Sequence, residues 1–300
     1  MARAVTRTWY RIALARPGAA PILVAASGEH LGAAVAAAEH HVGGAWAIAA
    51  ELATADQVPL GESVGRHQVV TLDEQLAEDL PAFRWPSGVL PALGRTDGVR
   101  GARRGYAVHP DDALLVIEAQ TEADRLIDLF LGVIELLPAA DNLEVRVLDH
   151  FEDAGRTDVW LTSRVNAKKI LRFLDDFDVE LIGNGHVELS VYVRAHRATL
   201  RLTEHKTVVW LAEERALEAE VTGWLRELGV PRISPLVTIS DAPHFHYRPV
   251  KSRDRKKLGE ELYRQRLRRV DSVERGERGE AGEAAERGER GERGERDTAG

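Results

Sequence analysis

The feature that most constrains the fold of this chain is the alternation of apolar and polar residues that begins at position 187. From 187 to 194 every second residue is aliphatic, and the residues between are Glu188, Ser190, Tyr192 and Arg194. Successive side chains of a strand point to opposite faces, so this period predicts a strand with one buried and one solvated face. Similar apolar runs follow at 199–203 and 208–211. We therefore expect an antiparallel meander with a solvated face.

The sequence on either side of these runs predicts a hairpin before them and a helix after them. Asn184-Gly185 is typical of a type I′ turn, which predicts that residues 179–182 form the first of four strands. An apolar stripe at helical spacing then spans residues 217–228, and Gly229 provides a stop. We expect this helix to cover the apolar face of the meander.

The whole chain is predicted to be an α+β protein with two modules. Residues 1–60 read as a small strand-strand-helix-strand module, and residues 61–112 as an irregular linker with a short helix. Residues 113–247 read as a larger C-terminal α+β domain, in which the antiparallel meander packs on helices. Its elements begin in the order strand, helix, strand, strand, helix, strand, so a ferredoxin-like core is one interpretation.

The C-terminal part of the sequence differs in composition from the two modules. Residues 248–270 predict a basic helix, and residues 248–269 contain ten basic and three acidic side chains. In residues 271–300 glycine recurs at nearly every third position among glutamate and arginine, without proline. We interpret this segment as a disordered tail rather than a collagen-like helix.

Composition limits the classes of protein to which the chain can belong. The sequence has no cysteine, which excludes disulfide bonds, thiolate zinc sites and cysteine nucleophiles. We find no apolar segment of signal-peptide or membrane-spanning length, so a cytoplasmic protein without membrane contact is expected. The preference for arginine over lysine, with abundant alanine and glycine, favours a GC-rich bacterial source.

Two histidines form the only metal-site hypothesis that the sequence supports. His244 and His246 flank Phe245, so on a strand both imidazoles project from the same face, where they can act as two metal ligands. A third ligand has to come from elsewhere in the chain, and His205 and His196 are candidates if this strand joins the meander. The alternative is a surface pair that stacks on aromatic side chains.

The basic segment provides a second hypothesis. Its first basic residues are Arg248, Lys251, Arg253, Arg255, Lys256 and Lys257. A helix of this charge can bind nucleic acid, with strong salt dependence, although the net charge of −8 opposes the approach of a polyanion. The same helix can instead pack on its own domain or on an acidic partner.

No catalytic motif accompanies these features: the sequence has no phosphate-binding loop, dinucleotide fingerprint or nucleophile elbow. Our leading interpretation is a non-catalytic accessory or adaptor protein that uses no cofactor and binds other proteins of a bacterial system. Its interaction surface would comprise Glu188, Ser190, Tyr192 and Arg194 together with the basic residues named above. The alternatives are a nucleic-acid-binding protein that uses residues 248–269 and a metal-dependent enzyme with a site at His244 and His246.

Overall fold

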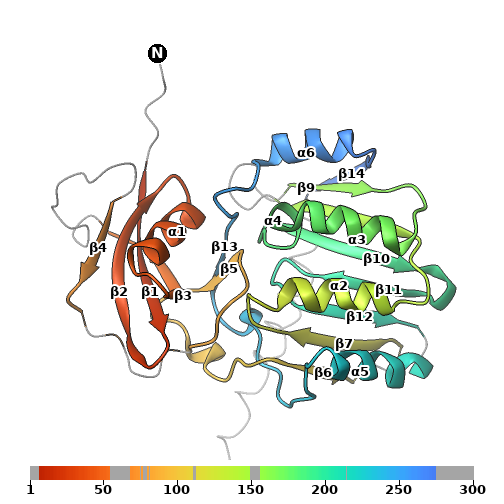
Figure 1. The fold of residues 1–300 in the computed structure, drawn as a ribbon, viewed down its shortest axis with the longest axis horizontal. Helices are drawn as coiled ribbons and strands as arrows, with labels where there is room; N and C mark the ends of the chain where they lie inside the picture. The colour runs from red at the N-terminus through yellow and green to blue at the C-terminus, as the bar shows by residue number, and fades with distance from the viewer. Residues whose placement is uncertain are drawn as a thin grey trace, which may run out of the picture.

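The structure is a computed structural model that describes residues 7–54, 68–74, 76, 80, 82–110, 113–148, 156–213 and 215–274. It consists of a small N-terminal sheet and a large C-terminal sheet, with a two-stranded sheet between them (Figure 1). The fold is therefore α+β, as the sequence predicts. Among the described residues, no helix is both long and apolar enough to span a membrane.

The N-terminal sheet follows the predicted strand-strand-helix-strand order and gains one more strand. Its elements are β1 (Thr8–Arg16), β2 (Ala19–Gly28), α1 (Leu31–His41), β3 (Trp46–Leu52) and β4 (Val69–Leu72). The strand order is β3-β1-β2-β4, and every pair is antiparallel. Strand β4 lies in the segment predicted as linker, so the module extends beyond residue 60. The predicted helix at 72–80 includes residues outside the described part of the chain.

The large sheet has eight antiparallel strands, in the order β14-β9-β8-β10-β11-β12-β7-β6. The strands are β6 (Gly105–His109), β7 (Leu115–Gln120), β8 (Asn142–Leu148), β9 (Arg156–Leu161), β10 (Val187–Val193), β11 (Ala198–Leu202), β12 (Val208–Ala212) and β14 (Arg268–Glu274). Strands β10, β11 and β12 form the meander that the alternation predicts. Aliphatic residues of this sheet, such as Val145, Leu189 and Leu200, are buried in one large core.

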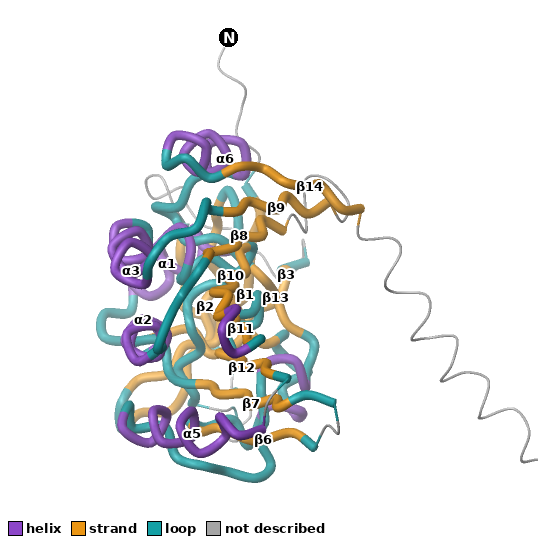
Figure 2. Tube along the Cα trace, turned by 90° about the vertical axis from the view of Figure 1, so that its right-hand side faces the viewer, coloured by secondary structure: helices purple, strands orange, loops and turns teal. Residues whose placement is uncertain are grey.

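Helices cover one face of the large sheet, and Figure 2 shows α2, α3 and α5 on the same side of its strands. The helices are α2 (Leu126–Leu136), α3 (Ala167–Asp176), α4 (Asp178–Leu181), α5 (Glu218–Glu227) and α6 (Arg255–Arg264). Asn166 caps α3, because its side chain accepts a hydrogen bond from the backbone N–H of Lys169 at 3.1 Å. The predicted helix after the meander, α5, contributes Val221 and Leu225 to the core.

The sheet order differs from that of a ferredoxin-like unit. Strands β7 and β8, which flank α2, are separated by β12, β11 and β10. Because each neighbouring pair is antiparallel, β7 and β8 run parallel to each other across these three strands. A ferredoxin-like unit leaves only one strand between the corresponding pair. The three strands of the meander therefore lie between β7 and β8, where the order of elements along the chain predicts a single strand.

The predicted hairpin at Asn184-Gly185 is wrong. Residues 178–181 form helix α4, and β10 pairs with β8 and β11. The Asn184 side chain accepts a hydrogen bond from the backbone N–H of His186 at 3.0 Å, which organises the turn that enters β10. An Asn-Gly pair favours a tight turn, but it does not determine whether the segment before the turn is a strand or a helix.

The C-terminal part of the chain crosses back to the N-terminal module, which changes the predicted domain boundaries. Strand β13 (His244–His246) pairs with β5 (Val89–Pro91) between the two large bodies (Figure 1). Ile239, Ala242 and Tyr247 belong to the core of the N-terminal module. Residues 113–247 are therefore not one self-contained domain.

Four short helices are also present, namely η2 (Asp97–Val99), η3 (Arg194–His196), η4 (Arg215–Leu217) and η5 (Ile239–Asp241).

The basic segment is also shorter than predicted. Helix α6 ends at Arg264, and residues 268–274 form the edge strand β14 rather than the end of a helix and the start of a tail. Leu258, Leu262 and Leu267 are buried in the large core, so this segment packs on its own domain. Residues 275–300, where the disordered tail is predicted, lie outside the described residues.

A close backbone contact joins the turn before β10 to the segment before β5. A Cβ atom placed on Gly185 would lie 1.9 Å from the carbonyl oxygen of Gly88. Gly88 has φ +102°, a conformation that side chains rarely allow. The backbone N–H of Gly185 also donates to the carbonyl of Tyr247 at 3.0 Å, and the N–H of Tyr247 donates to that of Gly88 at 2.8 Å. This contact holds β13 between the two bodies.

We expect Gly185→Ala to lower the free energy of unfolding by about 1–3 kcal/mol, because the added methyl group has no room against the backbone of Gly88. The matched control is Gly223→Ala in α5, where a Cβ meets no atom within 4 Å. That change should stabilise the protein by up to about 1 kcal/mol through helix propensity. Urea unfolding followed by circular dichroism measures the stability of both variants. Equal unfolding midpoints for Gly185→Ala and the native chain would show that the close contact with Gly88 is absent.

Candidate metal centre

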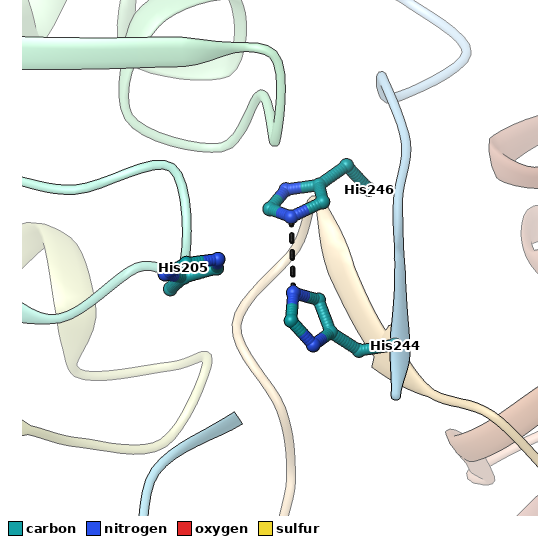
Figure 3. A group of neighbouring side chains, drawn as sticks. All are labelled: His205, His244 and His246. Carbon is teal, nitrogen blue, oxygen red and sulfur yellow. Dashed lines mark hydrogen bonds between the residues drawn. The ribbon is translucent and has the colours of Figure 1, made fainter. Parts of the chain in front are cut away.

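Two imidazoles of β13 face each other on one side of the strand, as the sequence predicts. Nε2 of His244 lies 3.1 Å from Nε2 of His246, and Figure 3 shows the two rings end to end. Phe245 between them packs against the N-terminal core instead. The alternation of a strand therefore separates a core residue from two polar ligands.

Backbone carbonyl groups fix the tautomer of both rings. Nδ1 of His244 lies 2.7 Å from the carbonyl oxygen of Ala242, and Nδ1 of His246 lies 3.0 Å from that of Gly185. A carbonyl oxygen only accepts hydrogen bonds, so both Nδ1 atoms carry the proton. In the neutral rings each Nε2 then bears a lone pair, and the two lone pairs face each other. Such an arrangement calls for a cation between them, either a shared proton or a metal ion.

The third imidazole comes from the large sheet. His205 lies in the turn between β11 and β12, and its ring centroid is 4.9 Å from that of His244 and 5.1 Å from that of His246. One ligand nitrogen of each ring can be chosen so that all three lie within 4.8 Å of one another. The structure thus brings His205 to the predicted pair, although β13 joins β5 and not the meander.

These distances are close to those of a zinc site with histidine ligands. Zn–N bonds of about 2.0–2.1 Å in tetrahedral geometry place neighbouring nitrogens roughly 3.3 Å apart. The His244 and His246 nitrogens already approach this separation at 3.1 Å. His205 completes the triangle if its turn moves by about 1–2 Å, since the three nitrogens lie within 4.8 Å of one another.

A buried lysine next to His205 holds this turn in place. Lys206 is 1% exposed and has φ +64°. Its ammonium group donates to the carbonyl oxygens of Asn184 at 2.6 Å and Val187 at 3.0 Å. Burial lowers the pKa of Lys206 to about 7, while the carboxylates of Glu188 and Glu204 act in the opposite direction. Lys206 therefore ties the His205 turn to the loop whose Gly185 carbonyl orients His246.

Two further polar groups lie beside His205. Its Nδ1 is 3.0 Å from Oγ of Ser240, and its Nε2 is 3.9 Å from Oε1 of Glu204. A hydrogen bond such as that of Ser240 orients a metal-binding imidazole and tunes its basicity. A carboxylate at this distance can also accept a proton near the cluster or approach a bound ion.

The other histidine considered from the sequence is not part of the cluster. His196 lies in η3, at the opposite end of β11 from the His205 turn. Nothing in its sequence spacing separated it from His205, because both lie near the ends of the same strand. The two histidines differ only in the end of β11 to which each is attached, and the end that carries His205 is the one near β13.

The predicted interaction surface on the meander is less exposed than the alternation indicates. Glu188 and Ser190 are only 7% and 6% exposed, and Glu188 accepts a hydrogen bond from Arg201 at 2.6 Å. Tyr192 is half-buried and donates to Oε2 of Glu144 at 2.7 Å. Burial and this hydrogen bond raise the pKa of Tyr192 to about 12. Long polar side chains on neighbouring strands cover one another. The sequence of a single strand therefore does not reveal how exposed its polar face is.

Arg194 lies at the end of that face, beside Asn142, which is opposite Tyr192 in the register of β8 and β10. It follows the end of β10 in η3, where its guanidinium group donates to Oδ1 of Asn142 at 3.0 Å. The four residues predicted as one surface therefore divide between a packed sheet face and an exposed corner.

The basic residues of the C-terminal segment are largely engaged with acidic groups of the same chain. Arg253 pairs with Glu180, and Arg255 lies 2.8 Å from Asp158. Lys251, Lys256 and Lys257 are exposed, with Lys257 3.5 Å from Asp254. Arg248 is half-buried near the start of α1. This pairing explains how a strongly basic helix packs on an acidic body.

Sequence reasoning missed the groups that support the cluster, namely Gly185, Lys206, Ser240 and Glu204. None of them lies at a motif spacing from His244, and their roles depend on backbone carbonyls that no sequence pattern reveals. Comparison of the chain with protein-family models, curated proteins and solved structures found no significant match. The site must therefore be interpreted from its own geometry.

We expect Lys206→Met to reduce the free energy of unfolding by about 1–3 kcal/mol, because the buried carbonyl groups of Asn184 and Val187 lose a charged donor. Methionine keeps the length and flexibility of the side chain. Lys257→Met is the control, since that lysine is 69% exposed and should change stability by less than about 0.5 kcal/mol. Chemical denaturation measures both changes, and equal effects would show that the buried lysine does not anchor the turn.

Proposed function

We propose that this chain is a metalloprotein that binds one divalent transition-metal ion through His205, His244 and His246, and that the bound ion serves metal-assisted hydrolysis. The observation that carries the proposal is the orientation of His244 and His246. Both present their Nε2 lone pairs to the same point because backbone carbonyls hold their Nδ1 protons.

The donor set favours zinc among the biological metals. Neutral imidazoles suit zinc, copper, iron and nickel, whereas magnesium and calcium prefer oxygen ligands. Structural zinc sites use four protein ligands, while catalytic sites keep three ligands and a water in the fourth position. Among the described residues the cluster contains three ligating side chains. This number supports a catalytic rather than a structural centre.

Such an ion lowers the pKa of its bound water to about 7 and makes hydroxide available as a nucleophile. Glu204 would be the group placed to accept a proton beside the ion, since its carboxylate is 3.9 Å from Nε2 of His205. Ser240 holds the ring of His205 in position through Nδ1.

The other two hypotheses from the sequence have weaker support. Binding of nucleic acid through residues 248–269 is disfavoured by the pairing of Arg253 and Arg255 with Glu180 and Asp158. An accessory or adaptor role stays a prediction, and the burial of Glu188 and Ser190 reduces the surface on which it was based. Metal binding is the function for which the side-chain geometry provides a specific reason.

We expect untagged protein, stripped with a chelator and reloaded, to bind one Zn²⁺ per chain by calorimetry and elemental analysis. His244→Ala should weaken binding by more than about 100-fold, since loss of a supporting group alone costs 10–100-fold. The control is His196→Ala, which removes a histidine outside the cluster and should leave the affinity unchanged.

A shared proton is the competing explanation for the short contact between His244 and His246. This explanation predicts that the native chain holds no stoichiometric zinc. It also predicts that His244→Ala and His196→Ala bind zinc equally weakly. That result would exclude the metal centre.

The open coordination position has its own test. Protein loaded with Co²⁺ should show the visible absorption of a four-coordinate site, and azide should change this spectrum by replacing the bound water. Glu204→Gln should keep both the metal and the azide response, because Glu204 is not a ligand in the proposal. If azide has no effect until Glu204 is replaced, then Glu204 fills the fourth position and the site is structural.

A further inference from the structure

A separate cavity of about 310 Å³ lies where the N-terminal module meets the large sheet and the start of α6. Its walls come from β1, the start of α1, the end of β3, the end of β8, β13 and α6. Cavities of this size at the junction of two modules are typical of small-molecule sites. The loop at Asn184 separates it from the His205 turn, while His246 borders both the cavity and the histidine cluster.

Most of the cavity wall is apolar. Leu31, Leu148 and Leu258 are almost completely buried and line it together with Phe245. Leu52 borders the opening and is 57% exposed, which is unusual for so large an apolar residue. These side chains suit the hydrocarbon part of a ligand.

One cation of the cavity has no direct ion pair among the described residues. Arg253 and Arg255 also line the cavity, but Arg253 pairs with Glu180, and Arg255 pairs with Asp158, which it shares with Arg269. Arg248 forms no ion pair or side-chain hydrogen bond with any residue that the structure describes, and it is half-buried. A half-buried guanidinium without a partner is unfavourable and is relieved by an anion.

The N-terminus of α1 places positive character beside Arg248. The eleven-residue helix α1 begins at the cavity, and its N-cap residue His30 makes no capping hydrogen bond. Nδ1 of His30 is buried without a partner, and burial followed by the Arg248 charge lowers the pKa of that ring. The first turn of α1 also packs against Arg248, since a Cβ on Gly32 would lie 2.0 Å from the Arg248 carbonyl oxygen. A helix N-terminus and a guanidinium group thus meet at one end of the apolar cavity.

The carboxylate of Asp254 attracts Arg248 through space, but among the described residues neither Asp254 nor Glu29 forms an ion pair with it. Asp254 is the N-cap of α6 and accepts a hydrogen bond from the backbone N–H of Lys257 at 2.9 Å. Glu29 is exposed at the rim. We propose that the cavity binds a small organic anion with an apolar body, whose carboxylate or phosphate pairs with Arg248 while its hydrocarbon part contacts the leucine wall. This site does not depend on the histidine cluster holding a metal.

The probe for the site is anilinonaphthalenesulfonate, an aromatic anion whose fluorescence rises in apolar surroundings. We expect one bound probe per folded chain in the presence of a metal chelator. Octanoate and octyl phosphate should displace it at concentrations about tenfold or more below those needed for octanol or octylammonium, because an ion pair in the cavity favours the anions. The stronger of the two anions indicates whether the natural ligand carries a carboxylate or a phosphate.

Variants test the two parts of the cavity separately. Arg248→Gln should weaken octanoate binding about tenfold or more, whereas Arg172→Gln, on the exposed side of α3, should not change it. Leu52→Glu places a negative charge at the exposed rim and should weaken octanoate binding, while Leu52→Gln, of equal size, serves as its neutral control. Circular dichroism confirms that each variant is folded.

The proposal is overturned if the folded chain does not bind the probe, or if octylammonium displaces it as well as octanoate does. Unchanged octanoate affinity in both Arg248→Gln and Leu52→Glu would also overturn it. None of these variants alters His205, His244 or His246, so failure of the anion site and failure of the metal centre can be distinguished.

Discussion

The contact between the backbones of Gly185 and Gly88 is the constraint on which the arrangement of this protein depends. It allows the turn before β10 to touch the segment before β5, and through Tyr247 it fixes β13 between the two bodies. Strand β13 has only three residues and pairs with an equally short β5, so it has little stability of its own. Hydrogen bonds to Gly185 and Gly88 hold it in place.

The histidine cluster is a consequence of that arrangement. Two of its rings come from β13, the third from a turn that Lys206 ties to the carbonyls of Asn184 and Val187. The same loop supplies the carbonyl of Gly185 that orients His246. A metal ion at this point would link the large sheet to the two-stranded sheet. Metal binding would then stabilise the contact between these two parts of the protein, and an intact contact would raise the affinity for the metal.

Part of the site follows from the sequence. The His-Phe-His spacing places two imidazoles on one face of any strand, and the structure has this strand. The sequence suggested His205 as a third ligand on the condition that the strand joined the meander, but β13 pairs with β5, and His205 reaches the pair from the turn between β11 and β12. Lys206 and Gly185 show no sequence signal, since a lone lysine in a polar turn is usually exposed and an Asn-Gly pair usually closes a hairpin.

The sequence by itself determined the α+β class, the meander, most helices and the pairing of His244 with His246, because each depends on periodicity within a few consecutive residues. The tertiary structure alone decided the order of the eight strands, the helical conformation of residues 178–181, the return of residues 239–247 to the N-terminal core, and the burial of Glu188 and Lys206. These features depend on which distant backbone groups meet. Local periodicity specifies which face of a segment is apolar, but it does not specify the segment that will cover it.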